Sequence, residues 1–288
     1  AKATADAELA KARKRELLAS DNAEDRAQGK KIEISDEYTR LKESGGSLAD
    51  YAVFEAKVYG GKADYSADEE GYSQKEKKEI LFEMDISEES MAAIYSAVFE
   101  DKNTKEEDSV LYAVKQGISA QTFVGFTSQE FEGEDKTGQK RKWLLDNCRD
   151  DKELKGMYER FMESEDTEEY KTIGYAAAQG VSPRKFVEFK QAVSEAKGSA
   201  GEAKTYSYWR NGKVVTEQYT GTESGSKAKE IYSELLGGGY SDKEIEVLYS
   251  MQFSDKIYPY AMEMGISARE YVKFKQAYAN IPKGKGKK

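Results

Sequence analysis

The chain of 288 residues contains 45 Lys and Arg against 54 Asp and Glu, one cysteine and no histidine. The lack of histidine excludes Ser-His-Asp and Cys-His catalysis and His-ligated zinc, and a single cysteine excludes an intramolecular disulfide framework. The net charge of −9 argues against a protein that simply coats nucleic acid, and 20 Tyr, 11 Phe and 2 Trp supply more aromatic surface than a disordered chain carries.

Residues 1–35 are rich in Ala, Lys and acidic residues and contain few large apolar side chains. This composition predicts a charged helix or a linker that is exposed to solvent. Because the sequence starts at Ala1 rather than at a methionine, we expect a processed product or a part of a longer polypeptide. We find no signal-peptide pattern and no run of 18 apolar residues, so we expect no membrane span.

One pattern recurs along the rest of the chain: Gly, Ile or Val, Ser, three variable residues, an aromatic residue, Val, one further residue and Phe. The three full copies and one weaker copy begin at Gly117, Gly180, Gly265 and Gly45. Each full copy is preceded by a Tyr-Ala pair, which begins at Tyr112, Tyr175 and Tyr260. This self-similarity predicts an array of repeats.

The recurring pattern predicts a corner between two helices. Its glycine suits the left-handed position that ends a helix, and the serine two residues later suits the N-cap of the next helix. The apolar residue between them has the spacing of a hydrophobic staple with the aromatic residue, as in Ile266 and Tyr271. We therefore expect structural corners at Gly117, Ser119, Gly180, Ser182, Gly265 and Ser267.

A second pattern precedes each full corner and predicts another helix. It starts with a polar N-cap, continues with acidic residues that favour the positive end of the helix dipole, and ends in a tyrosine. The copies run from Ser87 to Tyr95, from Asp150 to Tyr158 and from Ser241 to Tyr249. A further short helix is expected before each copy, at 77–84, 140–147 and 227–236. The recurring tyrosines of both patterns are expected to pack in the core or between helices.

The predicted fold is therefore mainly α, with about three full helical repeats, a partial N-terminal one and one β-hairpin insertion. We divide the chain into a charged helix or linker (1–35), a partial repeat (36–72), three repeats (73–137, 138–225 and 226–282) and a basic tail (283–288).

The β-hairpin is predicted near residues 205–219, within the repeat 138–225. Asn211 and Gly212 lie between residues of high β-propensity, which is a strong hairpin signal. The hairpin aromatics do not recur in the other repeats. These aromatics are Tyr206, Tyr208, Trp209 and Tyr219. We expect them to form either a partner-binding surface or a contact with a neighbouring repeat.

No residue of the sequence is assigned to catalysis, to a cofactor or to a metal. Cys148 lies among aspartates, and we interpret it as a small buried or incidental cysteine. The segment from Asp101 starts like a calcium loop, but Glu106 replaces the glycine that such a loop requires. The glycines at 237–239 lack the Lys-Ser/Thr of a phosphate-binding loop.

Two basic segments, 136–142 and the tail 283–288, are candidates for contact with phosphates. They have no interleaved aromatic residues, so we do not expect specific nucleic-acid binding. The tail would give only a weak, salt-sensitive attraction.

The corner pattern, at Tyr112–Phe126, Tyr175–Phe189 and Tyr260–Phe274, resembles the degenerate helical repeats of large phage and prophage polyproteins. The resemblance covers about residues 36–281. It implies a virion-associated or packaged protein, encoded near portal and minor-head genes and located in the virion or the host cytoplasm. It carries no active-site residues with it.

We therefore expect a non-enzymatic phage structural protein that acts through contacts with other virion proteins or with itself. One alternative is a helical-repeat scaffold that binds a peptide or protein along its concave face. Another is an enzyme with an unrecognised carboxylate site, because among 54 acidic residues some pair always has a suitable separation.

Overall fold

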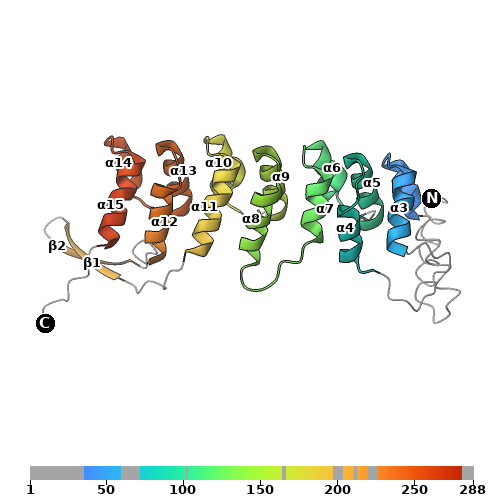
Figure 1. Cartoon of the computed structure of the whole chain (residues 1–288). Helices are drawn as coiled ribbons and strands as arrows, with labels where there is room; N and C mark the ends of the chain where they lie inside the picture. The colour runs from blue at the N-terminus through green and yellow to red at the C-terminus, as the bar shows by residue number, and fades with distance from the viewer. Residues whose placement is uncertain are drawn as a thin grey trace, which may run out of the picture. The chain divides into compact units, whose positions relative to one another are not determined.

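The structure is a computed structural model that describes residues 36–59, 72–101, 103–163, 167–196, 204–210, 213–219 and 226–280. Most of these residues are helical, which confirms the predicted mainly α fold (Figure 1). Backbone contacts divide the chain into two compact units, Ala1–Phe131 and Glu132–Lys288, which we call unit 1 and unit 2.

Unit 1 consists of short helices. Residues 36–43 are helical. They are followed by α3 (Leu48–Tyr59), α4 (Gln74–Phe82), α5 (Glu88–Phe99), the 3-10 helix η1 (Glu106–Asp108), α6 (Val110–Lys115) and α7 (Ala120–Ser128). The helix α7 packs against both α4 and α5, and α3 contacts α4.

Unit 2 contains two successive sets of helices with a pair of strands between them. The first set comprises α8 (Lys136–Asn147), α9 (Asp151–Phe161), the 3-10 helix η2 (Glu169–Lys171), α10 (Ile173–Ala178) and α11 (Pro183–Glu195). The second set comprises α12 (Ser226–Gly237), α13 (Asp242–Gln252), α14 (Tyr258–Glu263) and α15 (Ala268–Asn280). The helix α11 packs on α8 in the first set and contacts α12 of the second.

The strands β1 (Lys204–Arg210) and β2 (Lys213–Tyr219) pair antiparallel, with Tyr208 opposite Val215. Their side chains lie outside the described part of the structure. The expected surface of Tyr206, Tyr208, Trp209 and Tyr219 therefore stays a prediction.

The helices that follow the second sequence pattern begin where their caps predict. The Ser87 hydroxyl accepts a hydrogen bond from the Ser90 amide, and an Asp150 carboxylate oxygen accepts one from the Glu153 amide. At Ser241 the cap is reciprocal, because Glu244 also accepts from the Ser241 amide. Each cap satisfies an amide that has no partner within its own helix.

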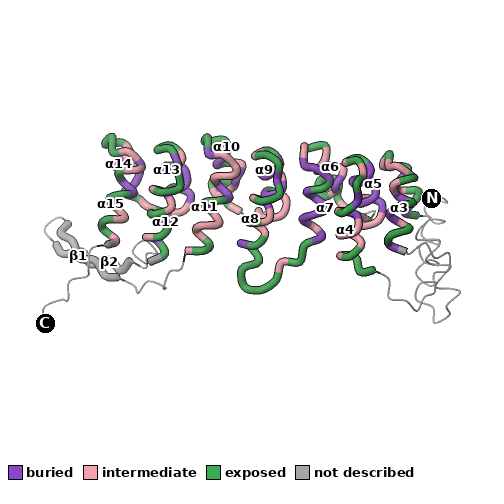
Figure 2. The backbone as a smooth tube through the Cα atoms, viewed as in Figure 1, coloured by how far each residue is buried: buried purple, intermediate pink, exposed green. Residues whose placement is uncertain are grey.

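The core of each unit runs along its helices, and Figure 2 shows buried segments in nearly all of them. Aromatic rings fill much of it. In unit 1 the rings of Tyr95 and Phe123 meet edge to face at 5.4 Å, and in unit 2 those of Tyr158 and Phe186 do so at 5.7 Å. Aromatic pairs prefer offset or edge-to-face contacts, so these rings help to fix how neighbouring helices pack.

The prediction for the recurring tyrosines is confirmed for one set and wrong for part of the other. Tyr95, Tyr158 and Tyr249 are buried. Tyr175 is 37% exposed and Tyr260 is 71% exposed. The short helices α10 and α14 each bury their first and fourth residues. Tyr175 and Tyr260 are the third residues of these helices and therefore lie outside the buried face.

Candidate functional site

The three corner glycines all have left-handed backbone, with φ of 93° at Gly117, 92° at Gly180 and 80° at Gly265. At the second corner the Gly180 amide donates to Ala177 O and the Val181 amide to Ala176 O, each at 3.0 Å. The other two corners have the same pair of hydrogen bonds. This is the Schellman arrangement, which ends a helix and satisfies its last carbonyls.

The corner serines cap the helices that follow. The hydroxyls of Ser119, Ser182 and Ser267 accept hydrogen bonds from the amides three residues later, at 3.0, 3.3 and 3.2 Å. Glu270 also accepts from the Ser267 amide at 3.2 Å, so the cap at this corner is reciprocal. The helix direction thus changes within two residues at each corner.

A carboxylate from an earlier helix binds the start of the corner helix in two of the three sets. Asp242 accepts hydrogen bonds from the amides of Ala268, at 3.1 Å, and Arg269, at 2.8 Å. Glu88 accepts from the Ala120 amide in the same way. We call Asp242 and Glu88 the capping carboxylates, because they bind the positive end of another helix.

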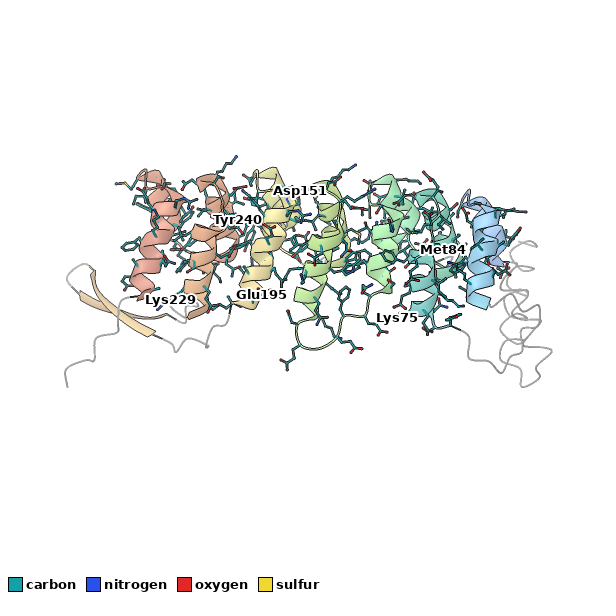
Figure 3. The ribbon with its side chains drawn as sticks, in the orientation of Figure 1. Lys75, Met84, Asp151, Glu195, Lys229 and Tyr240 are labelled. Atoms are coloured by element: carbon teal, nitrogen blue, oxygen red, sulfur yellow. The ribbon has the colours of Figure 1, made fainter. Side chains whose placement is uncertain are left out.

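The remaining set, α8 to α11, differs because Pro183 occupies the first position of α11 and has no amide hydrogen to donate. The equivalent acid, Asp151, is labelled in Figure 3. Sequence reasoning assigned these acids only to the dipole of their own helix. The signal available in the sequence was an acidic residue directly after the N-cap in every copy of the second pattern.

Two arginines join the corner helix to the end of the first helix of its set. Arg184 donates to Leu145 O at 2.8 Å, and Arg269 donates to Leu236 O at 3.2 Å. The final carbonyls of a helix have no partners within it, and a guanidinium supplies several donors at once. Sequence reasoning also missed this contact, although both arginines lie two residues after the corner serine.

A buried carboxylate links the last three helices. Asp255 Oδ2 accepts hydrogen bonds from the hydroxyls of Tyr249, at 2.7 Å, and Tyr271, at 2.8 Å, and pairs with Lys275 Nζ at 3.0 Å. Its Oδ1 accepts from the Ile257 amide at 3.0 Å. The Asp255 side chain is only 4% exposed.

The electrostatics of this cluster favour the ionised acid. Burial by itself would raise the pKa of Asp255, but the hydrogen bonds from Tyr249 and Lys275 outweigh it and lower the pKa to about 2. Burial and the neighbouring carboxylate raise the pKa of Tyr249, so its hydroxyl stays a donor. We therefore assign the cluster a structural role, since its polar groups bind one another.

Cys148 is buried. Burial is the main cause that raises the pKa of its thiol to about 12, and the negative charge of Glu153 is the next. Since the thiolate is the nucleophile, we expect Cys148 to react with a disulfide reagent at least about a hundredfold more slowly in the folded chain than in urea. The reagent releases a coloured thiolate when it reacts, and its absorbance at pH 8 measures both rates. The Cys148→Ser variant supplies the blank. Equal rates in the two conditions would contradict this placement of the thiol.

The acidic segment from Asp101 is a local turn, in which Asp101 Oδ1 accepts from the Asn103 amide at 2.7 Å. Within the described ranges, no group of three or more Cys, Asp or Glu residues is arranged to hold a metal ion. The same ranges contain no helix with the length and hydropathy to cross a membrane.

Large apolar side chains lie exposed on the last corner helix and the residue before its cap. Ile266 is 44% exposed, Phe274 62% and Tyr278 53%, and the rings of Phe274 and Tyr278 stack at 6.2 Å. We call these three residues the end face. The exposure of Ile266 differs from the predicted staple, in which it would be buried with Tyr271. An exposed apolar group of this kind is typical of an interaction surface.

Comparisons of the chain with protein families, with curated proteins and with solved structures found no match.

Proposed function

We propose that the protein is a non-enzymatic structural protein of a phage particle, virion-associated or packaged, and that it acts through protein–protein contacts. The end face is the observation that supports contact with another protein, because it exposes two stacked aromatic rings on α15 and an isoleucine just before this helix. The attribution to a phage particle rests on the resemblance of the corner sequences.

We further propose that the chain is an array of three full helical repeats and a partial one, with a β-hairpin inserted after α11. Three observations support the array: the corner glycines share a backbone conformation, the corner serines cap in the same way, and the arginine contacts of α11 and α15 correspond. In such an array each repeat is stabilised mainly by its neighbours.

Mass spectrometry of purified phage particles tests the proposed function. We expect peptides of this chain at a constant ratio to the major capsid protein across successive density-gradient fractions. A chain that is abundant in the lysate but separates from the particles would contradict the proposal. Portal and capsid genes beside the coding sequence would agree with it.

A helical-repeat scaffold that binds a peptide is the second candidate. It is favoured by exposed apolar side chains on α14 and at its two caps, Ile257, Tyr260 and Met264, which are 66%, 71% and 77% exposed. Residues at this spacing form one side of a helix, which suits an extended or helical peptide. If the scaffold function is correct, Tyr260→Lys should abolish partner binding, and the chain should be absent from particles.

A further inference from the structure

The helices α11 and α15 follow the same sequence pattern but differ in what covers them. Val181 and Phe189 of the α11 corner are each 1% exposed. Their equivalents, Ile266 and Phe274, are 44% and 62% exposed. Both corners lie in unit 2, so the structure itself shows the covered and the uncovered form of one surface.

The covered form is closed by the next helix pair, α12 and α13. Tyr240, labelled in Figure 3, lies between these two helices. Its ring meets the ring of Phe189 edge to face at 6.3 Å. Lys185 Nζ lies 5.9 Å from the centre of the Tyr240 ring and pairs with Glu244 at 2.8 Å. The contact thus combines an aromatic pair with one ion pair at its edge.

We propose that the end face is a stacking surface for a further helix pair of the α12–α13 kind, supplied by a partner protein. The partner would place an aromatic ring over Phe274, as Tyr240 covers Phe189. This inference rests on the proposed action through protein contacts, and not on the attribution to a phage particle.

The charge at the edge of the end face specifies the partner further. The position of Lys185 in α11 is occupied by Glu270 in α15, which is exposed and bound to Ser267. A partner with an acid at the position of Glu244 would bring two carboxylates together, which is unfavourable. We therefore infer that the partner carries a lysine, an arginine or a neutral residue there. The α12–α13 pair of a second copy, with its own Glu244, fits less well.

An extended chain tests the proposal. A second copy of residues 226–280 is joined to the end of the full chain by a flexible glycine–serine linker, in one form with Glu244 and in another with Glu244→Lys in the added copy. We expect the lysine form to slow hydrogen exchange of the α15 amides at least about tenfold and to raise the midpoint of thermal unfolding. The glutamate form should give a smaller effect.

Two variants of the acceptor provide the controls. Phe274→Lys, at an exposed position, should remove the protection, and Val53→Lys, at an exposed apolar position of α3 in unit 1, should retain it. An added copy that stays unfolded, or that folds without changing the exchange of α15, would overturn the proposal. Dimers of the unextended chain that Phe274→Lys dissociates would make a second copy the occupant and would overturn it as well. None of these outcomes depends on the composition of phage particles.

Discussion

Replacing Asp255 by alanine is expected to lower the free energy of unfolding by about 3 kcal/mol, because Lys275 and two tyrosine hydroxyls then lose a common buried acceptor. Urea denaturation monitored by tyrosine fluorescence and circular dichroism measures the loss. A matched control is Asp146→Ala, which removes the exposed ion pair with Lys142 and should change the stability by less than about 0.5 kcal/mol.

The effect of Asp255 should depend on pH in one direction. The folded chain holds the pKa of Asp255 at about 2, below its ordinary value of 3.8, so folding favours the ionised form. The stabilisation is present above about pH 4 and is lost as the pH falls through the folded pKa. The full loss is about 2.5 kcal/mol of unfolding free energy. The difference between the wild type and Asp255→Asn should shrink when urea midpoints are compared at pH 6 and pH 3. A difference that stays constant would show that Asp255 does not titrate as the structure indicates.

Gly180→Val should lower the stability by about 2 to 3 kcal/mol, because a β-branched residue is forced into left-handed backbone. The nearest heavy atom to an added Cβ is Lys243 Nζ, at 3.8 Å, so the cost arises from the backbone and not from a clash. The thermal midpoint measures the loss. Gly180→Asn should cost less, since asparagine tolerates this conformation, and Gly237→Ala, in open space without positive φ, should cost nothing. An unchanged midpoint for Gly180→Val would contradict the corner geometry.

The helix boundaries could be predicted from the sequence because their causes are local. A cap joins residues three positions apart, as in Ser241 and Glu244, and a corner glycine acts through its own φ. Such features depend on a few adjacent residues and leave the same trace in each copy. The mainly α fold could be predicted for the same reason.

The cluster around Asp255 could not be predicted, because its members come together only in the folded chain. Tyr271 follows Asp255 by 16 residues, and Ala268 follows the capping carboxylate Asp242 by 26. The same residue type also has different surroundings in different copies. Phe189 and Phe274 occupy one position of the pattern, yet only Phe189 is covered, since burial depends on what packs against a residue.

The capping carboxylates and the arginine contacts have a consequence for the origin of the chain. Asp242 and its donors lie in one stretch, 242–269, and Arg184 with its acceptor lies in another, 145–184. A gene duplication that copies such a stretch also copies both partners of the capping or arginine hydrogen bond within it. A newly duplicated segment would therefore carry its own capping and arginine contacts from the start, and later mutations could alter the surfaces between segments.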